Sequence, residues 1–450
     1  MLSMSIILIV FFITLVIAIL SGLVFLIPSV PIKYIKIHLY LIVLPIIISV
    51  IGLLNVSDRE QIGPFTKDHL AWLMGSFILI LDFIIQKFSV RYLIGDRNYR
   101  KYFPLFTLIT SFASIAWLSG DLRLMVLFWG ATLLSLTLLI RVNRSWKIPY
   151  EAAKVSGKSF ALGWLSLLVA VILLYVATGN WHINVTLAND DVITSGMRFI
   201  IDMLIVLAVI VPAAQFPFQS WLIESVAAPT PVSAIMHAGI VNAGGIILTR
   251  FSPVFNDPLA ITILLIIASI SVLLGSGISL VHVDYKRQLV GSTMSQMGFM
   301  LVQCALGVYS AAIIHLILHG VFKATLFLQS GSVVKRFNIP TPPSAKRSYS
   351  WVVLGRCLAI IIAILFWLGS DRSAYEILSA LILAWSLMVS WNQMVAFSRG
   401  LIGRVIGIIM IVIVALVYIV THHYFYNTLS HVYMNVAHPP LMSVIIGILI

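Results

Sequence analysis

Long apolar runs follow one another along the chain and are separated by short polar segments. Runs of about 20 apolar residues span a hydrocarbon core of about 30 Å. The runs are continuous rather than alternating, which favours transmembrane helices over the strands of a barrel. With breaks placed at charge clusters, the pattern predicts 14 spans. They are residues 4–28, 38–55, 70–88, 103–120, 122–141, 158–178, 197–218, 232–250, 259–281, 288–307, 309–334, 351–369, 373–396 and 401–421.

The composition of the 450 residues supports an all-α, polytopic membrane protein. Hydrophobic residues make up 61% of the chain and charged residues 10%, against roughly 45–50% and about 25% in ordinary globular domains. These values exclude a soluble enzyme, a nucleic-acid-binding protein and a secreted scaffold. Cys304 and Cys357 lie inside apolar spans without a neighbouring cysteine, so they indicate neither a disulfide framework nor a zinc site.

Basic residues are distributed unevenly over the predicted loops. Of the 28 lysines and arginines, 20 lie in one set of alternate loops and 6 in the other, and Lys323 and Arg356 lie inside spans. Because basic residues collect on the cytoplasmic side during insertion, the net charge of +13 does not require an acidic partner. We expect the loops 87–102, 141–158 and 335–350 to face the cytoplasm, and both termini to lie outside.

No large soluble domain interrupts the spans. The longest polar stretches, 56–69, 179–196 and 335–350, are expected to be loops, and the histidine-containing tail after residue 421 is expected to skirt the membrane. The first span is not expected to be a cleaved signal peptide, because it is too long and no basic residue precedes it.

Prolines gather around the seventh predicted span. Pro212 and Pro217 lie within it, and Pro229 and Pro231 precede the next span. Proline removes a backbone donor and clashes with the preceding turn, so a helix here must kink or break. In transporters such breaks often mark a route for ions or substrates, although a plain proline kink is the alternative.

The span 309–334 carries an unusual set of ionisable residues. His315, His319 and Lys323 follow one another at intervals of four residues, which places them within about 80° of arc on one helix face. A central lysine costs at least about 2.5 kcal/mol on insertion scales, so such residues are functional candidates. Histidine and a desolvated lysine can exchange protons near neutral pH. The three residues therefore predict a proton relay; a metal site on the two histidines and a structural polar cluster are the alternatives.

Three further ionisable residues inside predicted spans are candidates for the same path. They are His237, Asp82 and Asp202. A lone histidine in a membrane span is more often a packing residue than part of a relay, and each carboxylate could pair with a buried cation. We include all three among the candidate proton-conducting residues, and the sequence does not assign their partners.

Several sequence blocks resemble the antiporter-like membrane subunits, which include the distal subunit of respiratory complex I and the large subunits of Mrp-type sodium/proton antiporters. The resemblance covers about residues 70–335. The blocks are QFPFQSWL at 215–222, APTPVSA at 228–234, HA at 237–238, FSVRY at 88–92, GD at 95–96, STMSQMG at 292–298, His315 and His319, FKA at 322–324 and SGS at 330–332.

The resemblance implies two inverted five-helix repeats, each with a broken helix, and a polar axis across the membrane. His237, His315, His319 and Lys323 match family positions on that axis. The chain divides accordingly into N-terminal membrane helices (1–69), an antiporter-like core (70–335) and C-terminal membrane helices (336–450).

The chain also departs from the pumping members of the family. They carry a glutamate after the tryptophan of the fifth helix and a lysine on the seventh, where this chain has Gly130 and Pro212. The distal lysine of the second repeat has no counterpart, Arg372 being the nearest basic residue, and the long lateral helix is absent.

A scaffold that keeps half of the axis is similar to the DabB/MpsA-type subunits of two-component inorganic-carbon uptake systems. This resemblance implies a bacterial plasma-membrane subunit that conducts protons or sodium, and a large, cytoplasmic-face DabA/MpsB-type partner that contains zinc and resembles carbonic anhydrase. The chain itself is expected to hold no cofactor or metal and to be no enzyme, because it offers no nucleophile–base pair. The alternatives are a subunit of a complex I-like or Mrp-type antiporter and a membrane anchor that conducts nothing.

Overall fold

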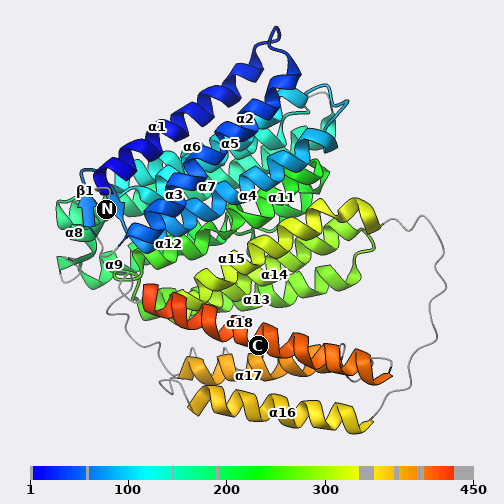
Figure 1. Cartoon of the computed structure of the whole chain (residues 1–450). Helices are drawn as coiled ribbons and strands as arrows, with labels where there is room; N and C mark the ends of the chain where they lie inside the picture. Colours follow the sequence, from blue (N-terminus) through cyan, green and yellow to red (C-terminus); the bar gives the residue numbers. More distant parts are fainter. Residues whose placement is uncertain are drawn as a thin grey trace. The chain divides into compact units, whose positions relative to one another are not determined.

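A computed structural model of the chain describes residues 4–56, 60–143, 146–188, 192–333, 349–368, 374–392, 395 and 400–429. The loop 335–348, Arg372 and the tail after residue 429 lie outside these residues. The described part is almost entirely helical, which confirms the predicted fold class. The helices of residues 4–333 lie side by side along their lengths (Figure 1).

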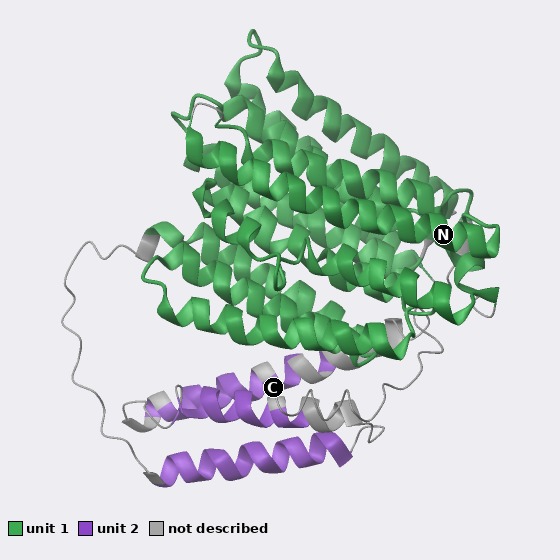
Figure 2. Ribbon diagram, turned by 180° about the vertical axis from the view of Figure 1, so that it is seen from behind, with its two compact units in different colours: residues 1–333, 428–437 green, residues 334–427, 438–450 purple. Residues whose placement is uncertain are grey.

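The chain forms two compact units, coloured separately in Figure 2. The first comprises residues 1–333 together with 428–437, and the second comprises 334–427 with 438–450. The helices of residues 1–333 are α1 (Met4–Leu23), α2 (Ile35–Leu41), α3 (Val43–Asn55), α4 (His69–Tyr92), α5 (Tyr99–Leu118), α6 (Leu122–Ile140), α7 (Lys147–Thr178), α8 (Ile183–Ala188), α9 (Ser195–Ile210), α10 (Ser220–Glu224), α11 (Thr230–Ala238), α12 (Ala243–Phe251), α13 (Pro258–Val281), α14 (Tyr285–Ala305) and α15 (Tyr309–Leu328).

The second unit holds α16 (Tyr349–Leu368), α17 (Ala374–Trp391) and all but the last residues of α18 (Gly400–Leu429). The indole of Trp391 donates to the carbonyl of Trp351 at 2.8 Å and lies where a side chain at Gly355 would stand. The small side chains of Ala363 and Ala380 pack together further along the same two helices. Small residues thus let α16 and α17 approach closely.

Each predicted span overlaps a helix or a pair of helices among the described residues. Within the part of the chain that the structure describes, ten helical segments are long and apolar enough to cross a membrane. The count of 14 therefore stays a prediction. The span 197–218 ends early, because α9 stops at Ile210 and Pro212 lies in the turn that follows.

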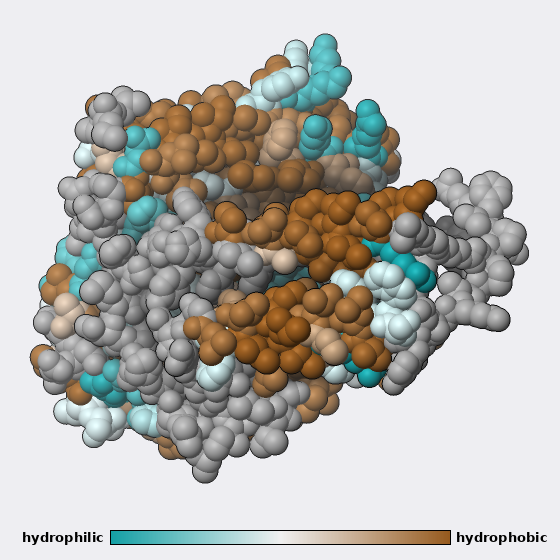
Figure 3. Space-filling view, turned by 60° about the horizontal axis from the view of Figure 1, so that its bottom comes forward, coloured by the Kyte–Doolittle hydropathy of each residue, from teal (hydrophilic) through white to brown (hydrophobic). Residues whose placement is uncertain are grey.

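Apolar side chains on the outer helices are exposed, as expected for a surface that lipid covers. On α1, the exposed residues recur on one face: Ile6, Ile9, Ile13, Val16 and Leu20. Figure 3 shows hydrophobic side chains along the visible helices, with hydrophilic ones mainly near helix ends. By contrast, α11 and α12 are buried along nearly their whole length.

The loop 56–69, expected to be irregular, contains a short antiparallel hairpin. Strands β1 (Glu60–Ile62) and β2 (Phe65–Lys67) pair through Ile62 and Phe65. The hairpin lies over the ends of neighbouring helices, because Gly120 N–H donates to the carbonyl of Pro64 at 2.8 Å. The polar residues of this stretch gave no alternating apolar pattern, so the sequence could not reveal its strands.

Carboxylates begin several helices. Asp68, Asp121, Asp257 and Asp284 are the N-caps of α4, α6, α13 and α14, and each accepts hydrogen bonds from backbone N–H groups of the first turn. Capping satisfies donors that have no partner within the helix. Much of the chain's small acidic content therefore stabilises helix ends.

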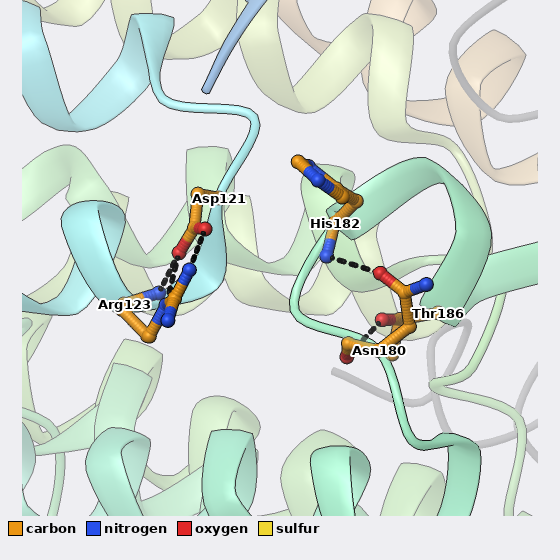
Figure 4. A network of polar contacts seen from close by, with 5 residues as sticks. All are labelled: Asp121, Arg123, Asn180, His182 and Thr186. Carbon is orange, nitrogen blue, oxygen red and sulfur yellow. Dashed lines mark hydrogen bonds and ion pairs between the residues drawn. The ribbon is translucent and has the colours of Figure 1, made fainter. Parts of the chain in front are cut away.

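Loops from distant parts of the first unit meet at one end of its helices, which we call the hairpin end. The backbone of Leu122 donates to Trp181 at 2.9 Å. Asp121 pairs with Arg123 at 2.7 Å, and Asn180 accepts from the backbone of His182 at 2.8 Å (Figure 4). Burial works to raise the pKa of Asp121, but its hydrogen bonds with Arg123 outweigh this effect and hold the pKa below its ordinary value.

The opposite ends of these helices, which we call the basic end, are joined by a second set of contacts. Arg100 donates to the carbonyl of Val30 at 2.5 Å, and Asn98 donates to Asn143 at 2.7 Å. The loops 87–102 and 141–158, which are predicted to share one side of the membrane, thus lie together at one end of the unit.

Candidate functional site

The two histidines and the lysine predicted as a relay lie on α15. His319 and Lys323 are buried, whereas His315 is partly exposed. The ring centroids of His315 and His319 are 6.0 Å apart with the planes at 77°. The three side chains therefore follow one face of α15, which we call the α15 stripe.

His315 is held by two amide side chains of α14. Its Nδ1 lies 3.1 Å from Gln303 Oε1, and its Nε2 lies 3.0 Å from Gln296 Oε1. Two amide oxygens can accept only if both ring nitrogens carry protons or one amide turns over. Gln296 belongs to the block STMSQMG, whereas sequence reasoning missed Gln303, which carries no motif signal.

Lys323 is satisfied by the backbone. Its Nζ donates to the carbonyl of Leu289 in α14 at 3.0 Å. No carboxylate forms an ion pair with it among the described residues. Both ring nitrogens of His319 also lack a hydrogen-bond partner in this part of the chain. Polar groups left open in this way favour water between the side chains.

His237 joins the stripe from a second helix. Its ring stacks on Phe327 of α15 with centroids 4.4 Å apart and planes at 16°. Both of its ring nitrogens lack a hydrogen-bond partner within the described residues. The two helices approach closely because residue 320 is glycine: a Cβ there would lie 2.6 Å from the carbonyl oxygen of Ala238.

The chain is interrupted directly after His237. Helix α11 ends at Ala238, a 3-10 turn covers Ile240–Asn242, and α12 begins at Ala243. A side chain at Gly239 would collide with Ile78 Cδ1 at 2.6 Å. This broken helix was not predicted from the residues; the glycines around it were the available signal. Such interruptions at membrane depth occur where the backbone is buried in protein or lines a cavity.

The prolines organise the segment before His237 without forming one kinked helix. Pro212 and Pro217 lie in turns, and the indole of Trp221 donates to the carbonyl of Val211 at 2.9 Å. Pro229 and Pro231 stand at the beginning of α11. Proline suits that position because the first helical N–H groups have no partner within the helix. The last two prolines thus start a helix and do not break one.

Two of the sequence blocks that carry the resemblance meet at the basic end of α11. Tyr92 of α4 donates to the hydroxyl of Thr230 at 3.0 Å. Lys286 of α14 donates to the carbonyl of Ala228 at 3.1 Å. The blocks FSVRY and APTPVSA, more than a hundred residues apart in the chain, therefore form one structural unit that positions His237.

Asp202 lies away from the stripe, and its carboxylate stabilises the turn that precedes α13. Its Oδ2 accepts from the backbone N–H groups of Asn256 at 3.1 Å and Asp257 at 2.9 Å. These bonds fix the start of α13. Asp82 has other partners again: its Oδ2 accepts from Gln86 at 2.8 Å. The structure thus brings His237, His315, His319 and Lys323 together, and places the two acids elsewhere.

One residue counted in an outer loop is buried. Arg250 forms an ion pair with Asp68 in the last turn of α12 and donates to the carbonyl of Trp117 at 2.9 Å. It therefore joins α12, α4 and α5 at the hairpin end as part of a helix and not of a loop.

Packed side chains surround Gly130 and Pro212, the two positions at which the pumping members of the family carry a glutamate and a lysine. The indole of Trp164 in α7 lies where a side chain at Gly130 would stand, with Cδ1 and Cε2 2.9 Å from an ideal Cβ. Its Nε1 donates to the carbonyl of Val126 at 2.9 Å. The neighbouring Gly163 accommodates the ring of Pro212, whose Cδ would lie 3.0 Å from a Cβ there. The first half therefore has no polar group at either position.

Comparison with known proteins agrees with this architecture. The family model for the transmembrane region of NADH:quinone oxidoreductases and Mrp antiporters matches residues 119–407. The chain belongs to this family of antiporter-like membrane subunits, and is accordingly a multi-pass membrane protein of a transporter family. The match begins later and ends later than the region 70–335 on which the resemblance was first based.

Within the family, the chain is 57% identical over 447 residues to the probable inorganic carbon transporter subunit DabB of Bacillus subtilis (strain 168). This alignment covers 99% of the chain and 88% of that protein. The resemblance to DabB-type subunits expected from the sequence is thus confirmed.

Two solved structures share the fold. A chain of the Mrp complex from Dietzia sp. DQ12-45-1b aligns with a TM-score of 0.70 at 21% identity, covering 98% of this chain and 55% of that chain. A chain of the membrane-bound sulfane sulfur reductase, an archaeal respiratory membrane complex, aligns with a TM-score of 0.66 at 18% identity, covering 99% and 93%.

Proposed function

We propose that the chain is the membrane subunit of a two-component inorganic-carbon uptake system, and that it conducts protons or sodium down their gradient to energise uptake of CO2 or bicarbonate. The observation that carries the proposal is the 57% identity to a DabB subunit over nearly the whole chain. The proposed proton-conducting residues are the α15 stripe and His237.

The stripe has the chemistry that such conduction needs. His319, Lys323 and His237 lie in one buried region, and the ring nitrogens of the two histidines have no hydrogen-bond partner among the described residues. Histidine and lysine can each take up and release a proton, and waters between them would complete a chain. Gln296 and Gln303 orient His315 at its partly exposed end.

The filled positions of the first half favour conduction over pumping. A pump needs a second set of ionisable groups that alternates with the first, and Gly130 and Pro212 offer none. The packing of Trp164 and Gly163 leaves no room for longer side chains at these positions. This argues against the alternative, a subunit of a complex I-like or Mrp-type antiporter.

The partner in this proposal is a large subunit of the DabA/MpsB type that contains zinc, resembles carbonic anhydrase and docks on the cytoplasmic face. Hydration chemistry would belong to that subunit. With the basic end in the cytoplasm, as basic loops prefer, both termini lie outside and Arg97, Lys101 and Lys147 offer charged docking contacts. Such charges mainly guide association.

Co-expression tests the proposal. In a bacterial strain that lacks carbonic anhydrase and cannot grow in air, the chain together with its partner is expected to restore growth, and neither alone should do so. Affinity purification of the chain should retain the partner with stoichiometric zinc. Growth restored by the chain alone would contradict the division of roles, and failure of the pair to take up labelled bicarbonate would contradict the proposal.

A further inference from the structure

A second buried polar cluster lies in the N-terminal helices, away from the α15 stripe. It contains Asp82 and Gln86 of α4, His38 of α2, Thr107 of α5 and Ser21 of α1. Asp82, Gln86, His38 and Thr107 are each at most 2% exposed. The sequence pattern singled out Asp82 alone, because His38 lies near the start of its span and was not distinguished from residues at a membrane boundary.

The cluster is a continuous hydrogen-bonded chain with defined directions. Gln86 Nε2 donates to Asp82 Oδ2 at 2.8 Å and to the hydroxyl of Thr107 at 3.0 Å. This fixes the amide so that its oxygen faces His38 Nε2, 3.1 Å away. The ring nitrogen must therefore carry the proton in this contact. The other ring nitrogen, Nδ1, lies 2.7 Å from the hydroxyl of Ser21.

The same geometry suits both protonation states of the imidazole. When His38 is neutral, the Ser21 hydroxyl can donate to Nδ1. When His38 is protonated, Nδ1–H can donate to the Ser21 oxygen, whose own proton then points to the carbonyl of Ala18 at 2.8 Å. A hydroxyl rotates at little cost, so no side chain has to move.

The surroundings of Asp82 are likewise compatible with both the ionised and the protonated carboxyl group. One oxygen, Oδ2, accepts from Gln86, whereas the other, Oδ1, accepts no hydrogen bond of normal geometry among the described residues and has the hydroxyl of Thr110 of α5 as a neighbour of its carboxyl group. A proton can therefore bind Oδ1 without breaking the bond to Gln86. Within the described part of the chain, no lysine or arginine pairs with Asp82, so an ionised carboxylate there has His38 as the one cation of its cluster.

An apolar layer separates the cluster from the stripe. Ile78, one turn before Asp82 on α4, lies against Gly239 of α11, and Phe77 lies against Gly320 of α15. The buried titratable groups on the helices packed against α4 are His38 of α2, His237 of α11, and His319 and Lys323 of α15. Of these, His38 is the one joined to Asp82 through the hydrogen bonds of Gln86. An isolated charge at this depth is costly, whereas a carboxyl and imidazole that share one proton stay neutral as a pair.

We propose that Asp82, joined through Gln86 to His38, is a second buried proton-binding site, separate from the α15 stripe and located in the N-terminal helices. The proton binds Asp82 Oδ1 and converts the carboxylate to the acid, while the Gln86 bond to Oδ2 is kept. Because His38 lies nearer the basic end of its helix than Asp82 does on α4, the site takes its proton from that end.

Infrared difference spectroscopy of the purified complex tests this site directly. A protonated carboxyl buried away from water gives a carbonyl stretching band that disappears when the proton leaves. We expect such a band to be lost as the pH rises, and to be absent in Asp82→Asn, which keeps an oxygen to accept from Gln86. Asp82→Glu should shift the band. A band unchanged in Asp82→Asn would overturn the proposal.

Controls separate this site from the stripe and from folding defects. Glu224→Gln removes an exposed carboxyl and should leave the band unchanged. Lys323→Ala should also retain the Asp82 band, whatever that variant does to uptake. A loss of conduction through the stripe can therefore be distinguished from a loss of the Asp82 site. His38→Gln should move the pH midpoint of the Asp82 band, and an unchanged midpoint would show that the two groups are not coupled.

Discussion

The indole of Trp164 occupies the space that a side chain at Gly130 would need. An ideal Cβ at Gly130 would lie 2.9 Å from Cδ1 and Cε2 of that ring, which is closer than packed carbon atoms approach. The glycine that replaces the pump's glutamate is therefore required by its neighbour on α7, and the two departures from the family pattern, at Gly130 and Pro212, are parts of one packing arrangement.

This relationship predicts that Gly130→Ala destabilises the protein by about 1–3 kcal/mol, as overpacking commonly does. Shortening the neighbour in Gly130→Ala/Trp164→Phe should recover part of the loss. Thermal unfolding of the purified protein in detergent measures both. Gly277→Ala is the matched control, since no atom lies within 4 Å of a Cβ there. Equal effects of the two alanines would contradict the packing argument.

Lys323→Ala is expected to abolish uptake while the protein stays inserted and assembled. The lysine donates a hydrogen bond to the carbonyl of Leu289, and its removal relieves a buried charge. Lys323→Arg should fail as well, because arginine keeps its proton. His319→Ala should retain part of the activity if water fills the gap. Growth in air and recovery from membranes report activity and assembly.

The control for this series is Lys87→Ala, which removes an exposed lysine at the basic end of α4. It should leave growth near the unsubstituted level. Normal growth of Lys323→Ala would show that the stripe is structural.

The ion pair between Arg250 and Asp68 predicts a strong stability effect. Arg250→Met leaves a buried carboxylate without its cation, and breaking one side of a buried pair typically costs about 3–5 kcal/mol. We expect poor recovery of this variant from membranes. The double variant Arg250→Met/Asp68→Asn should recover better, because asparagine carries no charge and still caps α4. A double variant no better than the single one would refute this explanation.

Orientation can be tested with two cysteines in a variant that lacks Cys304 and Cys357. Arg123→Cys lies at the hairpin end, where the arginine side chain is 62% exposed, and Lys154→Cys lies at the basic end on an exposed position of α7. We expect an impermeant thiol reagent to label residue 123 in intact cells and residue 154 only after permeabilisation. The reverse pattern would invert the proposed topology.

The sequence by itself determined the membrane class, the positions of the helices and the stripe on α15. These follow from local rules: an apolar run needs a helix to satisfy its backbone in lipid, and residues at intervals of four share a face. The basic loops likewise came together at one end because helices that cross a membrane must alternate in direction.

Only the tertiary structure decided which polar groups meet. The stacking of His237 on Phe327, the Asp82–Gln86–His38 chain and the Arg250–Asp68 pair join helices that are distant in sequence, and the bond of His315 to Gln303 joins two consecutive helices. The sequence also could not predict that Asp82 and Asp202 lie apart, because the composition of a span does not tell which face of the helix packs against its neighbours. That setting is fixed by close packing at glycines such as Gly239 and Gly320, where contact distances, not hydrophobicity, select the arrangement.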